Sequence, residues 1–290
     1  MPTHALPDVP GVAHHFVEAN GLRFHVAEAG TGDPLLMLHG WPQHWYMWRH
    51  VIPQLSRSYR VICPDLRGFG WSDAPATGYE KETLAADVLA LMDEMDLDRV
   101  KLVGHDWGGY VGFLMTLFQP QRVERYLALS IVHPWIKIDL KRASAAWRSA
   151  YQWVLASPAG PWLLRTQPAV VERAILGGTY DKTVWRPQEL QAFSHVLREP
   201  ARAAASSSLY RTFLAKEMLP LVTGRYDSYR LEVPTRLLVG RHDPAIGTEM
   251  LEGYEPHATA MEHEIIEEAS HFIVDEKPDL ITAKAEAFFG

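Results

Sequence analysis

The stretch LVGHDWGGY carries a carboxylate where a hydroxyl is usual. Gly104, Asp106 and Gly108 have the spacing of the G-x-S-x-G turn, which presents a serine nucleophile between a strand and a helix. Serine attack on a saturated carbon would leave an ether that water does not open under mild conditions, whereas carboxylate attack leaves an ester that water can hydrolyse. Asp106 therefore predicts displacement at carbon, with an epoxide oxygen or a halide leaving. The alternative interpretation is a plain turn in which Asp106 caps the following helix.

Two downstream residues have the types needed for the second half of such a reaction. Asp243 follows the apolar run PTRLLVG, and His271 follows MEHEIIEEAS, so both are predicted just past strand ends. Nucleophile, acid and histidine in this chain order is a known order for a catalytic triad. We expect His271, oriented by Asp243, to draw a proton from the water that opens the ester. Taken separately, an Asp before Pro is usual in turns, and a His before an aromatic residue is usual in packing.

A tight turn lies at LHGWP, where His39 to Pro42 follow another apolar run. Such a turn can aim the backbone N–H of Trp41 into the site. Together with the backbone N–H of Trp107, it would form an oxyanion hole for the tetrahedral intermediate. The alternative is an ordinary β-turn with proline at a favoured position.

These residues need a frame that brings distant strand ends together. Apolar or alternating runs that end in turn residues predict strands at LRFHVAEAG, PLLMLHG, YRVICPD, RVKLVGHD, VERYLALSI, PTRLLVGRHD and MEHEIIEEASH. Helices are predicted at 80–95, where apolar residues repeat at helical spacing, and at 107–118. Strands that alternate with helices indicate a mainly parallel sheet covered on both faces.

The pattern changes between about 135 and 225, where helical segments rich in Trp, Ala and Arg follow one another without a strand signal. The prolines that interrupt them are Pro158, Pro161, Pro168, Pro187 and Pro200. We interpret this region as a helical cap over the carboxyl ends of the strands, where open α/β sheets place their ligands. The predicted organisation is a first core part at 1–134, a cap at 135–225 and a second core part at 226–290.

Composition limits the partners. The 290 residues include 28 Lys and Arg against 35 Asp and Glu, a net charge of -7 without runs of like charge, which argues against nucleic acid and anionic membranes. Cys63 is the single cysteine, so no internal disulfide can form and a reducing compartment is expected. Without a leader-like start or an apolar span of about 18 residues, we predict a cytoplasmic protein that binds a small molecule. No metal or other cofactor is expected, and monomer and homodimer both stay open.

The core resembles the α/β-hydrolase family of epoxide hydrolases in five segments that keep the family's order: HGWPQHWYMWRHVIPQL, PDLRGFGWSD, LVGHDWGGYVG, VGRHDP and SHFIVDEKP. The resemblance implies an α/β-hydrolase fold with a mainly parallel eight-stranded sheet, helices on both faces and a helical cap. It also implies hydrolysis of an epoxide to a vicinal diol through an ester on Asp106. The pair Asp106 and Trp107 is shared with haloalkane dehalogenases, which use the same kind of Asp-His-Asp triad.

Epoxide opening needs an acid for the departing oxygen, and epoxide hydrolases take it from cap tyrosines. The segments SAYQWVLASPAG and SSSLYRTFLAKE resemble those that carry them, which implies Tyr151 and Tyr210 as the ring-opening acids. Tyr180 is a rival for the first position. The second segment departs from the family's Asn-aromatic-Tyr-Arg pattern, because Ser208 and Leu209 precede Tyr210 here. Either tyrosine could instead be an amphipathic cap residue that fills space.

Dehalogenation is the alternative reaction. The indole N–H of Trp107 could bind a halide, with Trp41 or Trp153 as the second donor, and the same three tryptophans are predicted to contact the substrate. Fluoroacetate-type dehalogenases carry carboxylate-binding arginines after the nucleophile, where this chain has Trp107 and Tyr110, so a carboxylate substrate is not expected. A serine-type esterase lacks its nucleophile here, and a mere binding protein would have no use for the Asp–His pair.

The aromatic residues of the turn and cap bear on the substrate. They include Trp41, Trp45, Trp107, Trp147, Trp153 and Trp162. Although tryptophan is also frequent in protein interiors, this content favours an apolar epoxide, including an aryl-substituted one.

Overall fold

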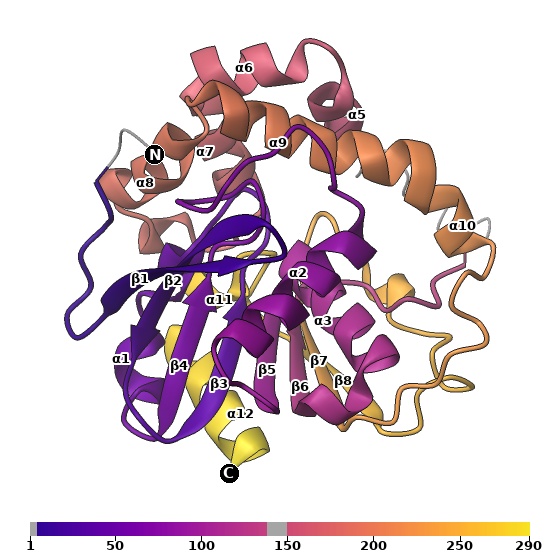
Figure 1. The fold of residues 1–290 in the computed structure, drawn as a ribbon. Coiled ribbons are helices and arrows are strands. Elements are labelled where there is room, and N and C mark those ends of the chain that lie inside the picture. The colour runs from indigo at the N-terminus through magenta and orange to yellow at the C-terminus, as the bar shows by residue number, and fades with distance from the viewer. Residues whose placement is uncertain (1–4, 138–149) are drawn as a thin grey trace.

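The computed structural model describes residues 5–137 and 150–290, and its centre is a twisted sheet (Figure 1). Its eight strands run in the order β1-β2-β4-β3-β5-β6-β7-β8. β2 is antiparallel to β1 and to β4, and all other neighbours are parallel. The strands are β1 (Ala13–Ala19), β2 (Leu22–Ala29), β3 (Asp33–Leu38), β4 (Tyr59–Pro64), β5 (Val100–His105), β6 (Val123–Leu129), β7 (Thr235–Gly240) and β8 (Met261–Ile266). The predicted mainly parallel, eight-stranded sheet is confirmed.

Helices cover both faces of this sheet, which explains why its central strands have continuous apolar sequences. All six residues of β5 are buried. α2 (Lys81–Glu94) and α3 (Trp107–Phe118) lie on one face, and α1 (Ile52–Leu55) and α12 (Pro278–Phe289) lie on the other (Figure 1). The helices predicted at 80–95 and 107–118 are therefore both present. The short helical segments of the core are η1 (Trp45–Trp48), η2 (Pro120–Arg122), η6 (Thr248–Met250) and α11 (Ile273–Glu276).

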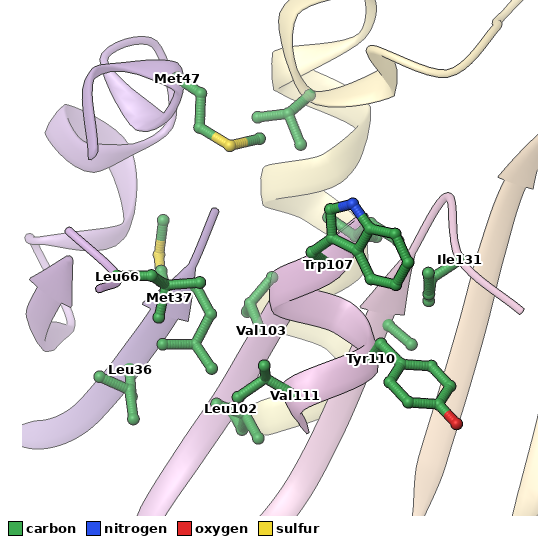
Figure 2. Packing of buried hydrophobic residues seen from close by; sticks show 14 of the residues in the cluster. Leu36, Met37, Met47, Leu66, Leu102, Val103, Trp107, Tyr110, Val111 and Ile131 are labelled. Atoms are coloured by element: carbon green, nitrogen blue, oxygen red, sulfur yellow. The ribbon is translucent and has the colours of Figure 1, made fainter. Parts of the chain in front are cut away.

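The core reaches up to the residues predicted to do chemistry. Figure 2 shows Leu102 and Val103 of β5 beside Val111 of α3, with Trp107 above the carboxyl ends of the strands. Each of these side chains is buried. The start of α3 is thus set on a close-packed base, which fixes the strand-to-helix turn in front of it.

Helices without an intervening strand fill the described residues between β6 and β7, and Figure 1 shows α5 to α9 as a layer above the sheet. They are α5 (Ala150–Ala156), α6 (Gly160–Thr166), α7 (Pro168–Gly177), η4 (Lys182–Val184), α8 (Pro187–Val196), α9 (Pro200–Thr212), the π-helical turn η5 (Phe213–Glu217) and α10 (Met218–Val222). Three of the prolines begin helices, where a missing N–H costs nothing. Among the described residues, none of the helices combines the length and apolarity that crossing a membrane requires.

Candidate active site

Asp106 occupies a strained turn between β5 and α3. Its backbone has φ 52° and ψ -126°, a region that residues other than glycine rarely adopt. Close approach of the chain explains the flanking glycines: a Cβ at Gly108 would lie 2.3 Å from the carbonyl oxygen of His39, and one at Gly104 would lie 2.6 Å from that of Gly108. The Asp106 side chain makes no capping hydrogen bond to α3. The alternative of a plain capping aspartate is therefore wrong, and the carboxylate is presented to the cap side of the sheet.

The three residues of the predicted triad meet at the carboxyl edge of the sheet. Nδ1 of His271 lies 2.9 Å from Oδ2 of Asp243, and Nε2 of His271 lies 3.5 Å from Oδ2 of Asp106. The second oxygen of Asp243 accepts hydrogen bonds from the backbone N–H groups of Ala245 and Ile246, at 2.8 and 2.9 Å. These hydrogen bonds hold the Asp243 carboxylate in position. Asp243 in turn sets the orientation of the His271 ring and, in its neutral form, the tautomer.

The two oxygens of Asp106 have different surroundings. Oδ1 accepts a hydrogen bond of 2.7 Å from the backbone N–H of Trp41, and the nearby backbone N–H of Trp107 helps to lower the pKa of this carboxylate. A Cβ at Gly40 would lie 2.3 Å from Oδ1, so only glycine lets the turn after β3 approach so closely. The two predicted oxyanion-hole donors therefore both lie next to the Asp106 carboxylate, and Oδ2 is the oxygen that faces His271.

The pKa shifts of Asp106 and His271 favour the charged form of each side chain. Burial would raise the pKa of Asp106, but the hydrogen bond and charge of His271 outweigh it and lower that pKa. Burial would lower the pKa of His271, but the charge of Asp243 and the contact with Asp106 raise it to about 10. At neutral pH the free site thus holds an ionised carboxylate beside an imidazolium.

The structure brings Tyr151 and Tyr210 together above Asp106. Their rings lie 5.8 Å apart edge to face. Tyr151 stacks on the indole of Trp41 at 6.1 Å, and Tyr210 makes edge contacts with Trp41 at 5.4 Å and with Trp107 at 5.9 Å. Tyr180 lies elsewhere, 49% exposed and stacked on His242 at 4.6 Å. Tyr151, and not its rival Tyr180, therefore pairs with Tyr210.

Both of these phenols are protonated at neutral pH. Burial raises the pKa of Tyr210 well above its ordinary value, and the negative charge of Asp106 adds to the effect. Although 38% of the Tyr151 surface stays exposed, burial of its hydroxyl end and the charge of Asp106 raise its pKa to about 12. Two O–H donors are thus available next to the Asp106 carboxylate, and proton donors are what an oxygen leaving group needs.

Trp153 departs from the prediction that it contacts the substrate. Its side chain is 59% exposed on α5. Residues two apart on a helix point to nearly opposite sides, so with Tyr151 turned toward the site Trp153 turns away from it. Trp147, which was also counted among the aromatic residues of the site, lies outside the described residues.

Known proteins are similar to this chain in sequence and fold over most of its length. Residues 33–278 match the family described as the alpha/beta hydrolase fold. The soluble epoxide hydrolase of Corynebacterium sp. (strain C12) is 30% identical, over 96% of this chain and 97% of its own. Epoxide hydrolase 4 of Mus musculus is 29% identical, over 94% of this chain and 77% of its own. The solved structure of the epoxide hydrolase CorEH without ligand has a TM-score of 0.84 at 30% identity and covers 96% of this chain and 98% of its own.

The chain belongs to the epoxide hydrolases of the alpha/beta hydrolase fold. It is a hydrolase that acts on ether bonds.

One residue of this epoxide hydrolase that sequence reasoning missed joins the cap to the histidine loop. Oε1 of Glu276 accepts from the backbone N–H of Ser270 at 2.9 Å, and Oε2 accepts from those of Tyr180 and Asp181 at 2.7 and 3.2 Å. The backbone N–H of His271 donates to the carbonyl oxygen of Gly178 at 2.9 Å. His271, the histidine of the predicted triad, is thus held by the cap as well as by the core.

The change Glu276→Gln is expected to slow ester hydrolysis more than ring opening. In the variant an NH₂ group replaces one of the two carboxylate oxygens that accept from backbone N–H groups. Two donors then face each other, which loosens the loop that carries His271. We expect about a 10-fold slower hydrolysis step, in line with roughly 1 to 2 kcal/mol of lost positioning, and a nearly unchanged first step. Single-turnover kinetics of the two phases measure this. Equal slowing of both phases would contradict a role specific to His271.

Proposed function

We propose that this epoxide hydrolase converts an apolar epoxide, including an aryl-substituted one, to a vicinal diol through a covalent ester on Asp106. The observation that carries the proposal is the difference between the two carboxylate oxygens: Oδ1 accepts a hydrogen bond from the backbone N–H of Trp41, and Oδ2 lies beside His271. An apolar substrate is favoured by the aromatic rings of Trp41, Trp107, Tyr151 and Tyr210, which contact one another above the carboxylate.

In the first step Oδ2 of Asp106 attacks an epoxide carbon from the side opposite the C–O bond that breaks. The departing oxygen takes a proton from the phenol of Tyr210 or Tyr151, so a hydroxyalkyl ester and a phenolate form. Esterification removes the negative charge of Asp106. Because that charge helps to raise the pKa of His271, the imidazolium becomes more acidic at this moment and returns a proton to the phenolate by way of solvent.

In the second step neutral His271 takes a proton from water, and the hydroxide attacks Cγ of Asp106. The negative charge develops on Oδ1, to which the backbone N–H of Trp41 already donates, and the backbone N–H of Trp107 is proposed to donate to it as well. Each such donor is typically worth roughly 3 kcal/mol in the barrier. On collapse the Cγ–Oδ2 bond breaks, the remaining proton of the water passes to Oδ2 as the diol leaves, and the carboxylate and the imidazolium of the resting site are restored.

A side-by-side assay with styrene oxide and 1-bromobutane tests the proposed reaction. We expect diol from styrene oxide and little bromide from 1-bromobutane. Bromide release without diol formation would favour the second candidate, hydrolytic dehalogenation. One observation speaks for that candidate: the indole nitrogens of Trp41 and Trp107 are buried and lack an acceptor within hydrogen-bond distance among the described residues.

The change Asp106→Asn is expected to lower the pKa of His271. The variant resembles the ester, because it keeps the shape of the side chain and removes its charge. Loss of a neighbouring opposite charge typically lowers a histidine pKa by about 1 to 3 pH units. The imidazole resonances of His271, followed by NMR as a function of pH, measure the change. A pKa that stays at its wild-type value would contradict the proposed activation of the base by esterification.

A further inference from the structure

A buried lysine outside the triad has its charge next to the site. Lys81 is the first residue of α2 and is only 1% exposed. Its ammonium group donates to Oε2 of Glu217 at 2.7 Å and to the backbone carbonyls of Tyr79 and Leu209, both at 3.3 Å. An ammonium has three donors, so all are used. Burying a charge is costly even when it is paired, which makes its position here worth explaining.

The contacts of Lys81 reach both the nucleophile turn and a cap tyrosine. Its Nζ lies 4.6 Å from the ring centroid of Trp107, which is the distance of a cation–π interaction. The carbonyl of Leu209, which it binds, belongs to the residue before Tyr210. The backbone N–H of Lys81 also donates to Oε1 of Glu217 at 2.7 Å. One core residue therefore touches Trp107, the end of α9 and the π-helical turn η5 at once.

Trp107 connects this charge to the phenol of Tyr210. Its indole nitrogen lies on the side of the ring that faces away from the sheet (Figure 2). Interaction with Trp107 lowers the pKa of Tyr210, against the larger effect of burial. The indole N–H nevertheless has no acceptor within ordinary hydrogen-bond distance among the described residues. Its ring makes an edge contact with that of Tyr210 at 5.9 Å, so a charged phenolate oxygen there would attract the indole N–H.

We propose that Lys81 is a positioning residue for ring opening, which polarises the indole of Trp107 so that its N–H stabilises the phenolate formed at Tyr210. A cation over one face of an aromatic ring withdraws electron density from it and makes its N–H a stronger donor. The hydrogen bond to Leu209 holds Tyr210 at the same time. This inference rests on the proposed function, because it assigns Lys81 to the step in which Tyr210 gives up its proton.

A second lysine provides a matched control. Lys216 lines the same cleft, of about 220 Å³, as Lys81 and Glu217. It pairs with Glu80 at 2.6 Å, and its side chain is 65% exposed. Replacing Lys216 removes the same charge from the same cleft without touching Trp107 or Tyr210.

The kinetic test compares Lys81→Gln, Lys81→Met and Lys216→Met in single turnovers of styrene oxide. Glutamine keeps donors for the Leu209 carbonyl but loses the charge. We expect ring opening to slow about 10-fold in both Lys81 variants, within the range of a desolvated cation–π interaction, with ester hydrolysis changed less than about 2-fold. Lys216→Met should match the wild type. Wild-type ring opening in Lys81→Gln, with slow ring opening in Tyr210→Phe, would overturn the proposal.

A spectroscopic test does not depend on turnover. In protein labelled with ¹⁵N-tryptophan, the indole resonance of Trp107 is the one that disappears in Trp107→Phe. We expect it to move upfield in the proton dimension in Lys81→Gln and to keep its position in Lys216→Met. Lys81→Arg keeps the charge and should retain both the resonance and ring opening to within about 3-fold. If the Trp107 indole resonance has the same position in the wild type and in Lys81→Gln, the proposal for Lys81 is overturned, whether or not the wild type acts on epoxides. Inactivity of the wild type on epoxides would instead refute the proposed function.

Discussion

Replacing His271 by alanine is expected to give an enzyme that attacks an epoxide but does not release the product. Oδ1 of Asp106 keeps its hydrogen bond from Trp41, which favours the ionised carboxylate that attacks, whereas the base that activates water is gone. Protein mass should rise by the mass of one substrate, and the addition should map to the peptide that contains Asp106. Steady-state turnover should fall by about 10⁴-fold or more, as for loss of a member of a triad.

Two controls make this result specific. His242 is an exposed histidine directly before Asp243, and His242→Ala should turn over without accumulating an adduct. The competing mechanism, in which Asp106 directs water straight onto the epoxide, forms no adduct in any variant. In a single wild-type turnover in heavy-oxygen water, the ester route places the label in Asp106 and an unlabelled carboxylate oxygen in the diol. Label in the diol on that first turnover, with none in Asp106, would refute the ester route.

Tyr210→Phe is expected to slow ring opening by about 10- to 1000-fold, the range of positioned proton donors. The phenol is buried, contacts the rings of Trp41 and Trp107, and has a pKa raised well above its ordinary value. Phenylalanine keeps these packing contacts and removes only the proton donor. Hydrolysis of the ester should change little, because that step uses His271. Single-turnover formation and decay of the alkylated protein measure the two rates separately.

The cap offers a matched control for this variant. Tyr180→Phe removes a phenol that stacks on His242 outside the site, and ring opening should be unaffected. Tyr151→Phe should slow ring opening as well, since its ring contacts that of Tyr210. If Tyr151→Phe and Tyr210→Phe both form the adduct at the wild-type rate, the leaving group needs no acid, and dehalogenation becomes the better assignment.

The triad could be predicted because each of its residues follows a strand whose pattern is local. Asp106, Asp243 and His271 stand just past apolar runs, and parallel strands bring their carboxyl ends to one edge. The order of the strands in the sheet was not needed for this. The choice between Tyr151 and Tyr180 was different, because it depends on which cap helix faces the core. The cap helices are short and interrupted by prolines, so their sequence periodicity does not show which of them faces the core.

Two features, β1 and the role of Glu276, did not follow from the sequence, and each has a physical cause. β1 does not follow from its pattern, because the sequence AHHFVEA neither alternates regularly nor forms an apolar run. Asn20 and Gly21, at φ 48° and 71°, form a two-residue turn that pairs Ala19 with Leu22. Asn-Gly between two strands is a strong hairpin signal that pointed to it. Glu276 was missed because its partners are backbone N–H groups, two of them about 95 residues away along the chain. The type of a residue does not indicate which distant backbone N–H groups it will bind.

Because the two Asp106 oxygens have different surroundings, we expect only one of them to be exchanged during turnover. In the proposed ester route, Oδ2 leaves with every diol and the oxygen of the attacking water takes its place, while Oδ1 keeps its hydrogen bond from the N–H of Trp41. The carboxylate then consists of one permanent atom and one that is renewed at each cycle. However many cycles the enzyme completes in heavy-oxygen water, Asp106 should gain one heavy atom and not two. Only a rotation of the carboxylate that breaks the bond to Trp41 would let the permanent atom escape.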